Sequence, residues 1–150
     1  FDTGKKTMTG GRVKKLQKSI GNETCMLTYG DGISNIDLNS LLKFHKSHGK
    51  LVTVSAVRPP ARFGAIKLEE NRVVSFKEKS KTEEGWINGG FFVLSPRIMD
   101  YIDNDNTTWE REPLENLASE GQLSAFKHNG FWQCIDTPRD LDYFEKNFKN

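Results

Sequence analysis

The sequence contains no long apolar run. None of its hydrophobic stretches approaches the roughly 20 residues that a membrane-spanning helix needs, and no signal-peptide pattern opens the chain. Neither sign of charge dominates, because 22 basic residues are spread among 20 acidic ones and the formal net charge is +2. Internal repeats, low-complexity tracts and linkers are also missing. These absences predict a soluble protein with no membrane partner and no nucleic-acid partner.

Cysteine and histidine are scarce. Cys25 and Cys134 are the two cysteines, and both lie in apolar strand-like segments, which is typical of reduced core residues rather than of disulfides or a metal site. Reduced cysteines favour a cytoplasmic location. The three histidines, at 45, 48 and 128, have neither a metal-ligand cluster nor a nucleophile near them in the sequence. His45 and His48 are expected on the solvent side of a helix.

What is present is one domain's worth of ordinary globular sequence. The 150 residues are 35% hydrophobic and 28% charged, which predicts a single domain over residues 1–150 with a real core. Strands alternate with helices, and this order indicates an α/β fold with some antiparallel hairpins. Buried strands are expected at 24–29, 51–57 and 89–95, hairpins at 63–78 and around Asn129-Gly130, and helices after Thr9, after Asp37, from Pro96, from Pro113 and from Pro138.

Asp31 is the first candidate for chemistry. It ends the apolar run "TCMLTY" between two glycines, Gly30 and Gly32. A carboxylate at the carboxyl end of a core strand points into the crevice where α/β proteins bind ligands, and glycines let a phosphate come close. Mg²⁺ is held by one or two carboxylates together with substrate phosphates. The alternative is a tight turn, because Asp-Gly is a common turn dipeptide.

Asp136 is the second candidate. It follows the apolar segment "FWQCI" and precedes a helix, so its plainest role is to cap that helix. Thr137 and Asp140, however, have capping-box spacing with Pro138 in the first turn, which leaves Asp136 free to face the same crevice. If both aspartates converge, they form a metal site.

Weaker candidates come from three other segments. "FKEKSK" places Glu78 and Lys79 at a strand end, where they can bind a sugar hydroxyl and a phosphate or stay solvated. Asn88 precedes the pair Gly89-Gly90, which suggests a bulge or the close approach of a ligand. "TGGR" offers backbone N–H groups and Arg12 to a phosphate. The specific phosphate-loop patterns, G-x-x-x-x-G-K-[ST] and G-x-G-x-x-G, are both absent.

Each motif is weak alone, but their order along the chain is specific. "TGGR", "TYGDG", "RFGAI", "FKEK", "INGGFFVL", "TTWEREPL" and "GFWQCIDTPRD" follow one another over essentially all 150 residues. This succession closely resembles the glucose-1-phosphate cytidylyltransferases, within the sugar-phosphate nucleotidyltransferases. The last three motifs favour the cytidylyl branch over thymidylyl and uridylyl relatives.

The resemblance implies a Rossmann-like nucleotidyltransferase fold, with a mixed sheet, helices on both faces and added hairpins. It implies Mg²⁺-dependent conversion of CTP and α-D-glucose 1-phosphate to CDP-glucose and pyrophosphate, for the dideoxysugars of bacterial O-antigen lipopolysaccharide. The cytoplasmic enzyme would be a homo-oligomer. The implied roles are metal binding and catalysis for Asp31 and Asp136, catalysis for Lys79, nucleotide binding for Thr7, Arg12 and Gly30, and sugar-phosphate binding for Gly64, Glu78, Lys79 and Asn88.

The chain departs from the family pattern in two places. Ser80 stands where the family has the proline of "EKPK". The family's first strand, its "GGxGTRL" loop and the "KP" lysine are absent, so the chain is interpreted as a C-terminal portion, incomplete at its N-terminus and inactive alone. Because that missing part reads the base, the base preference stays open. Three alternatives also stay open: a thymidylyl or uridylyl transferase, a non-catalytic remnant that binds sugar phosphate or serves assembly, and an unrelated α/β binding module.

Overall fold

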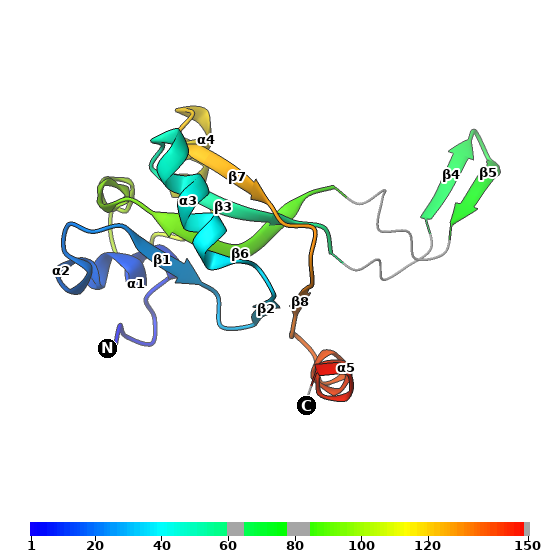
Figure 1. Cartoon of the computed structure of the whole chain (residues 1–150), viewed down its shortest axis with the longest axis horizontal. Helices are drawn as coiled ribbons and strands as arrows, with labels where there is room; N and C mark the ends of the chain where they lie inside the picture. The colour runs from blue at the N-terminus through cyan, green and yellow to red at the C-terminus, as the bar shows by residue number, and fades with distance from the viewer. Residues whose placement is uncertain (60–64, 78–84, 149–150) are drawn as a thin grey trace. The chain divides into compact units, whose positions relative to one another are not determined.

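The computed structural model describes residues 1–59, 65–77 and 85–148, and its α/β architecture agrees with the sequence prediction (Figure 1). The helical elements are α1 (Thr9–Lys15), α2 (Gln17–Ile20), α3 (Leu38–His48), the 3₁₀ helix η1 (Pro96–Tyr101), α4 (Glu112–Ser119) and α5 (Pro138–Phe148). The strands are β1 (Cys25–Thr28), β2 (Gly32–Ser34), β3 (Val52–Val57), β4 (Ala65–Glu69), β5 (Arg72–Lys77), β6 (Ile87–Leu94), β7 (Leu123–Lys127) and β8 (Trp132–Cys134).

The chain divides into two compact units. The first unit comprises Phe1–Thr28, Asp37–Ser55 and Gly90–Phe126, and the second comprises Tyr29–Ile36, Ala56–Gly89 and Lys127–Asn150. Strands β3, β6 and β7 each begin in one unit and end in the other. Within the described residues, no helix is long and apolar enough to cross a membrane.

The largest sheet has four strands in the order β1-β6-β3-β7. β1 pairs antiparallel with β6. β3 and β7 run parallel, because the Val52 N–H donates to the Gln122 carbonyl and the His128 N–H donates to the Ala56 carbonyl. The sheet is therefore mixed. β1 was expected to be buried, and this is wrong: it is an edge strand, and its Met26 is 43% exposed.

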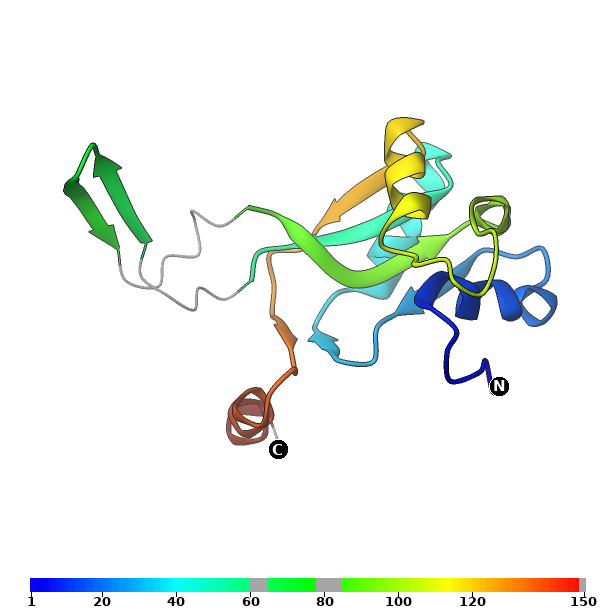
Figure 2. The same ribbon diagram turned by 180° about the vertical axis from the view of Figure 1, so that it is seen from behind.

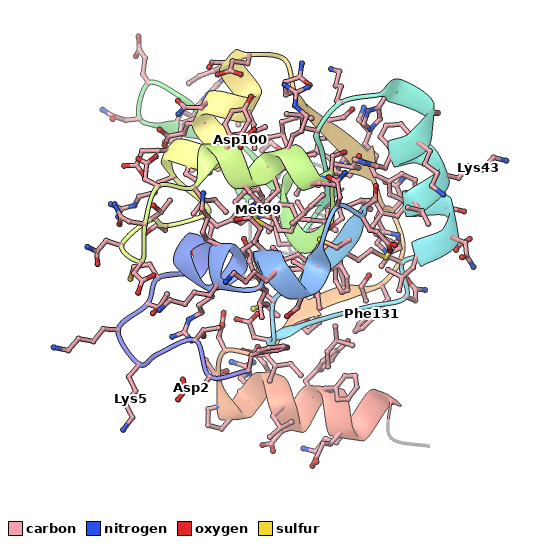
Figure 3. All side chains as sticks on the ribbon, turned by 90° about the vertical axis from the view of Figure 1, so that its left-hand side faces the viewer. Asp2, Lys5, Lys43, Met99, Asp100 and Phe131 are labelled. Carbon is pink, nitrogen blue, oxygen red and sulfur yellow. The ribbon has the colours of Figure 1, made fainter. Side chains whose placement is uncertain are left out.

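The first unit has helices on both faces of its strands. α3 covers one face (Figure 1), and α4 covers the opposite face (Figure 2). Leu41 of α3 and Trp109, just before α4, are both fully buried. The Trp109 ring meets Phe92 of β6 edge-on, with centroids 5.9 Å apart. Lys14 of α1 donates to the main-chain carbonyl of Met99 at 2.7 Å, which holds η1 against α1 (Figure 3).

Local capping explains where α3 and α5 begin. The Asp37 carboxylate accepts from the backbone N–H groups of Asn39 and Ser40, so it satisfies two otherwise unpaired donors of α3. Gly49 then ends α3 in the left-handed conformation, at φ 67°. The predicted capping box of α5 is also present, because Thr137 and Asp140 exchange side-chain-to-backbone hydrogen bonds at 3.0 and 3.3 Å.

The position expected for His45 is wrong. Its side chain is 4% exposed rather than solvated, because it lies on the side of α3 that faces β3. Its Nδ1 lies 2.9 Å from the Thr53 hydroxyl and its Nε2 lies 3.2 Å from the Ser95 hydroxyl. His48 Nε2 reaches the same Thr53 hydroxyl at 2.8 Å, while its Nδ1 accepts from the Lys50 backbone N–H. Buried polar groups need hydrogen-bond partners, and the Thr53 hydroxyl is a partner of both imidazoles.

The hairpin expected around Asn129-Gly130 is also wrong. β7 pairs inside the four-stranded sheet, and β8 pairs with β2 in a separate two-stranded sheet. Longer-range pairing takes both strands that flank the Asn129-Gly130 dipeptide to other partners. The hairpin of β4 and β5 is confirmed, with antiparallel pairing from Ala65↔Lys77 to Glu69↔Arg72.

Candidate functional site

The pairing of β2 with β8 brings two distant parts of the sequence together in the second unit. Gly32 lies opposite Cys134 in this antiparallel ladder. One step beyond it, the Ile135 backbone N–H donates to the Asp31 carbonyl oxygen at 2.9 Å. Asp31, just before β2, and Asp136, just after β8, are thereby held beside each other, although more than 100 positions separate them in the sequence.

The far end of the same ladder is fixed by side-chain bonds. The Asn35 amide oxygen accepts from the Phe131 backbone N–H at 2.8 Å. The Ser34 hydroxyl donates to the Phe131 carbonyl at 2.8 Å. The indole N–H of Trp132 donates to the Gly89 carbonyl at 2.8 Å, which ties β8 to the start of β6. A short ladder of three residue pairs is thus held in one register by bonds outside its own backbone.

Asp31, Cys134 and Asp136 form the resulting cluster. One carboxylate oxygen from each aspartate and the cysteine sulfur all lie within 4.8 Å of one another. Both aspartates are exposed and the cysteine is half-buried. Exposed paired carboxylates fit Mg²⁺, which takes one or two carboxylates and leaves its other positions to water or phosphate oxygens. The structure therefore brings together the two residues that sequence analysis paired, and their role as metal ligands stays a prediction.

Helix capping was the competing interpretation of Asp136, but other residues make the capping bonds. The capping bonds at the start of α5 are made by Thr137 and Asp140. The Asp136 carboxylate instead approaches the Cys134 thiol and Asp31. Helix capping therefore does not account for the acidic side chain of Asp136.

The Cys134 thiol is the residue of this cluster that sequence analysis missed. The pKa of Cys134 is raised to about 11, chiefly by burial and then by a hydrogen bond to Asp136 and the negative charges of Asp31 and Asp136. The thiol is accordingly protonated at neutral pH and donates toward the carboxylates. Both cysteines are free, as predicted, but neither is a fully buried core residue. The available signal was the spacing Cys-x-Asp at the end of a strand.

Gly30 and Asn88 lie in the same unit as the cluster. A Cβ added at Gly30 would meet no atom within 4 Å, so the space over this backbone is open. Asn88 of β6 donates its side-chain amide to the Tyr29 hydroxyl at 3.2 Å. Tyr29 directly precedes Gly30 and was not singled out from the sequence, although a phenol can both donate and accept a hydrogen bond. The predicted binding roles of Gly30 and Asn88 are not tested by these contacts.

Thr7 and Arg12 belong to the first unit and make local bonds. The Thr7 side chain is 7% exposed; its hydroxyl donates to the Thr3 carbonyl and accepts from Lys15. Arg12 is exposed and donates to the Thr3 hydroxyl at 2.6 Å. Their predicted contacts with a nucleotide stay predictions.

The glycines of "TGGR" have a packing explanation. A Cβ at Gly10 would lie 2.8 Å from the Thr107 carbonyl oxygen, and one at Gly11 would lie 2.7 Å from Asp105 Cα. The Gly11 N–H already donates to Thr107. These glycines therefore let α1 approach the 105–107 loop, whatever else the motif does.

The remaining predicted site residues, Gly64, Glu78 and Lys79, lie outside the described residues. Trp86 lies close to them in the sequence and is half-buried. The Arg58 guanidinium lies 4.7 Å and the Lys127 ammonium 5.6 Å from the Trp86 ring centroid. Cation–π contacts of this kind explain Trp86 as a structural anchor of the second unit.

Comparisons with known proteins identify the family. The sequence pattern of the family described as "Nucleotidyl transferase" matches residues 6–147. The chain is 51% identical over 145 residues to the glucose-1-phosphate cytidylyltransferase of Salmonella typhi, covering 96% of this chain and 56% of that protein. It is 38% identical over 115 residues to mannose-1-phosphate guanylyltransferase 1 of Arabidopsis thaliana, covering 73% of this chain and 32% of that protein.

A solved structure extends the agreement to the fold. The crystal structure of HddC from Yersinia pseudotuberculosis superposes with a TM-score of 0.71 at 24% identity, covering 97% of this chain and 64% of that one. The Rossmann-like nucleotidyltransferase fold implied by the sequence resemblance is thereby confirmed. The chain spans a little over half the length of the Salmonella relative. With a family match over nearly all of its residues, the chain belongs to the nucleotidyl transferase family.

Proposed function

We propose that this chain supplies the metal-binding and sugar-phosphate-binding part of a glucose-1-phosphate cytidylyltransferase. The reaction is transfer of the cytidylyl group of CTP to α-D-glucose 1-phosphate, giving CDP-glucose and pyrophosphate. The observation that carries the proposal is the convergence of Asp31 and Asp136, whose carboxylate oxygens lie within 4.8 Å of each other. The choice of cytidylyl transfer is supported by 51% identity to the Salmonella enzyme of that name, against 38% to a guanylyltransferase.

Asp31 and Asp136 would hold Mg²⁺. When bound, that ion would draw charge from the nucleotide phosphates and lower the repulsion between the two anionic substrates. The carboxylates fit this task because they are exposed and because the β2–β8 ladder fixes their separation. Their preorganisation means that little rearrangement is needed as charge builds on the α-phosphate.

The chemistry is an in-line displacement at the α-phosphorus. A phosphate oxygen of glucose 1-phosphate forms the new P–O bond, and the bond to the pyrophosphate leaving group breaks. No covalent enzyme intermediate is required, so the chain's residues act by positioning and by neutralising charge. Glu78, Asn88 and Gly64 would hold the sugar, and Lys79 would pair with its phosphate. Thr7, Arg12 and Gly30 would contact the nucleotide. These assignments follow the motif resemblance.

The biological setting is part of the same proposal. CDP-glucose would feed the dideoxysugars of bacterial O-antigen lipopolysaccharide, and the enzyme would act in the cytoplasm as a homo-oligomer. This setting follows the motif resemblance.

A second candidate function is sugar-phosphate binding without turnover. It is favoured by one observation: the chain spans 56% of the Salmonella enzyme. The experiment that separates the two compares this chain alone with a protein of the relatives' full length that contains it. Pyrophosphate release is measured with glucose 1-phosphate, Mg²⁺ and each of CTP, GTP, TTP and UTP. We expect little or no release by the chain alone, and release by the full-length protein with CTP fastest.

The outcomes discriminate clearly. Robust turnover by the isolated chain would contradict the view that the additional length of the relatives is required for activity. A full-length protein that binds glucose 1-phosphate, detected by calorimetry, but turns over none of the four nucleotides would favour the non-catalytic alternative. Preference for TTP or UTP would move the assignment to the thymidylyl or uridylyl branch.

A further inference from the structure

Cys134 places a thiol between the two carboxylates of the candidate metal site. Its sulfur and one oxygen from each aspartate are mutually within 4.8 Å. All three residues are held by one ladder, because Cys134 belongs to β8 and the aspartates lie just beyond the paired ends of β2 and β8. The sulfur is half-buried and the carboxylates are exposed, so an ion from solvent can reach the cluster through the aspartates.

A thiol adds nothing to a magnesium site. Mg²⁺ prefers oxygen ligands, whereas thiolates select soft or borderline cations such as Zn²⁺ and Cd²⁺. A combination of one sulfur and two carboxylates leaves a fourth tetrahedral position open, which is the pattern of zinc sites with three protein ligands.

The distances allow such a site after small movements. With Zn–S of about 2.3 Å and Zn–O of about 2.0–2.2 Å, neighbouring ligand atoms of a tetrahedral site are on the order of 3.6 Å apart. The three atoms already lie within 4.8 Å of one another. Rotation of the exposed aspartate side chains about their own bonds can close the difference without moving the backbone.

We propose that Cys134 converts the Asp31–Asp136 pair into a site that also binds a thiophilic divalent cation, through one sulfur and two carboxylate oxygens. On binding, the S–H bond breaks, the sulfur keeps the electron pair as it forms the metal–sulfur bond, and the proton passes to solvent. The same ion occupies the place proposed for Mg²⁺, so the two cations compete. This last step rests on the proposed function; binding of the thiophilic ion itself does not.

Cd²⁺ is the probe that reports the sulfur directly. Titration of the purified chain with Cd²⁺, in a buffer free of chelators and thiols, is followed by the ultraviolet charge-transfer absorption of a thiolate–cadmium bond. We expect a band that saturates at one equivalent, and we expect excess Mg²⁺ to raise the apparent Kd of Cd²⁺. Absence of the band would overturn the proposal, whereas a band that Mg²⁺ does not affect would overturn only the shared place of the two cations.

Variants assign the sulfur. Cys25→Ser is the matched control, since Cys25 is the chain's other free cysteine and lies on β1 in the first unit. The band should persist in Cys25→Ser and vanish in Cys134→Ser and Cys134→Ala. Asp31→Asn should weaken Cd²⁺ binding at least about tenfold. Persistence of the band in both Cys134 variants would place the sulfur elsewhere and overturn the assignment.

A measurement on the unaltered chain guards against variants that do not fold. Alkylation with iodoacetamide, located by mass spectrometry, should be slowed by Cd²⁺ at Cys134 and not at Cys25. Equal protection, or none, would count against the site.

Failure of this inference can be told apart from failure of the proposed function. In the full-length protein, the ratio of cytidylyl transfer with and without added Zn²⁺ is compared between the unaltered enzyme and Cys134→Ser. Cytidylyl transfer by a protein that shows no cadmium band would contradict only the proposed thiophilic site. A cadmium band that depends on Cys134, in a protein with no transfer activity, sinks only the cytidylyltransferase proposal.

Discussion

The two units of this molecule are stabilised in different ways. The first unit buries Leu41, Val52 and Trp109 completely and holds its helices by packing. In the second unit, Leu68 and Val73 of the β4–β5 hairpin are 52% and 53% exposed, and the candidate site depends on a three-pair ladder closed by side-chain bonds. The candidate metal ligands Asp31 and Asp136 therefore lie where burial is low and where a short ladder sets the register.

This difference has a physical reason. Exposed carboxylates carry their charge at little cost in free energy, because water still solvates them. They also remain accessible to an ion and to phosphates. In a fully packed unit, burial would favour the protonated form of such carboxylates, or the packing would exclude these side chains. The first unit, in contrast, gains its stability from apolar area removed from water.

The largest expected effect tests the packing side of the comparison. Leu41→Ala removes a fully buried side chain from α3 and should lower the free energy of unfolding by about 2–5 kcal/mol. Leu68→Ala is the matched control in the second unit, where the side chain is 52% exposed, and should cost less than about 1 kcal/mol. Urea denaturation followed by circular dichroism measures both. Equal costs would contradict the contrast between the units.

The second-largest expected effect tests the candidate metal ligands of the second unit. In the full-length protein, Asp31→Asn should lower turnover on the order of 100-fold with little loss of unfolding free energy, because this carboxylate is exposed. Asp136→Asn should behave alike. The double variant should cost much less than the sum of the two single losses, because both residues serve one ion.

The control for the aspartate pair is Asp142→Asn, an exposed acid on α5. It should leave turnover near that of the unaltered protein. Additive losses in the double variant would mean that Asp31 and Asp136 act independently, and near-normal turnover in Asp31→Asn would reduce that residue to a turn former.

The smallest effect is a pH dependence of the first unit. Burial, and then the nearby charge of His48, lower the pKa of His45; burial and Lys50 lower the pKa of His48. The folded state therefore resists protonation more than the unfolded chain does. Their contribution to stability is complete above the unfolded histidine pKa of about 6.5 and is lost as pH falls below it.

The measurement is the free energy of unfolding between pH 7.5 and pH 5, by urea denaturation at each pH. His45→Gln should flatten the decline in this window. His128→Gln is the control, because His128 lies in the second unit and its Nε2 donates to the Phe131 carbonyl. An unchanged slope in His45→Gln would show that His45 does not carry the dependence.

Sequence reasoning succeeded where the cause is local. Asp37 and Gly49 bound α3, and Thr137 with Asp140 starts α5, because a cap depends on residues within one helical turn. The hairpin around Asn129-Gly130 was wrong because a turn dipeptide does not choose strand partners. Cys134 and Tyr29 were missed because their importance comes from neighbours distant in sequence, namely Asp31 and Asn88.

The amino-acid order alone was enough for the alternation of helices and strands, for the caps of α3 and α5 and for the family, since these depend on short-range patterns and on a succession of motifs. Tertiary pairing decided which residues share a site. Asp31 and Asp136 are separated by more than 100 positions, and only the β2–β8 ladder brings them together with a thiol. Contacts across such a separation depend on which strand pairing has the lowest free energy in the whole fold, and no local pattern encodes that choice.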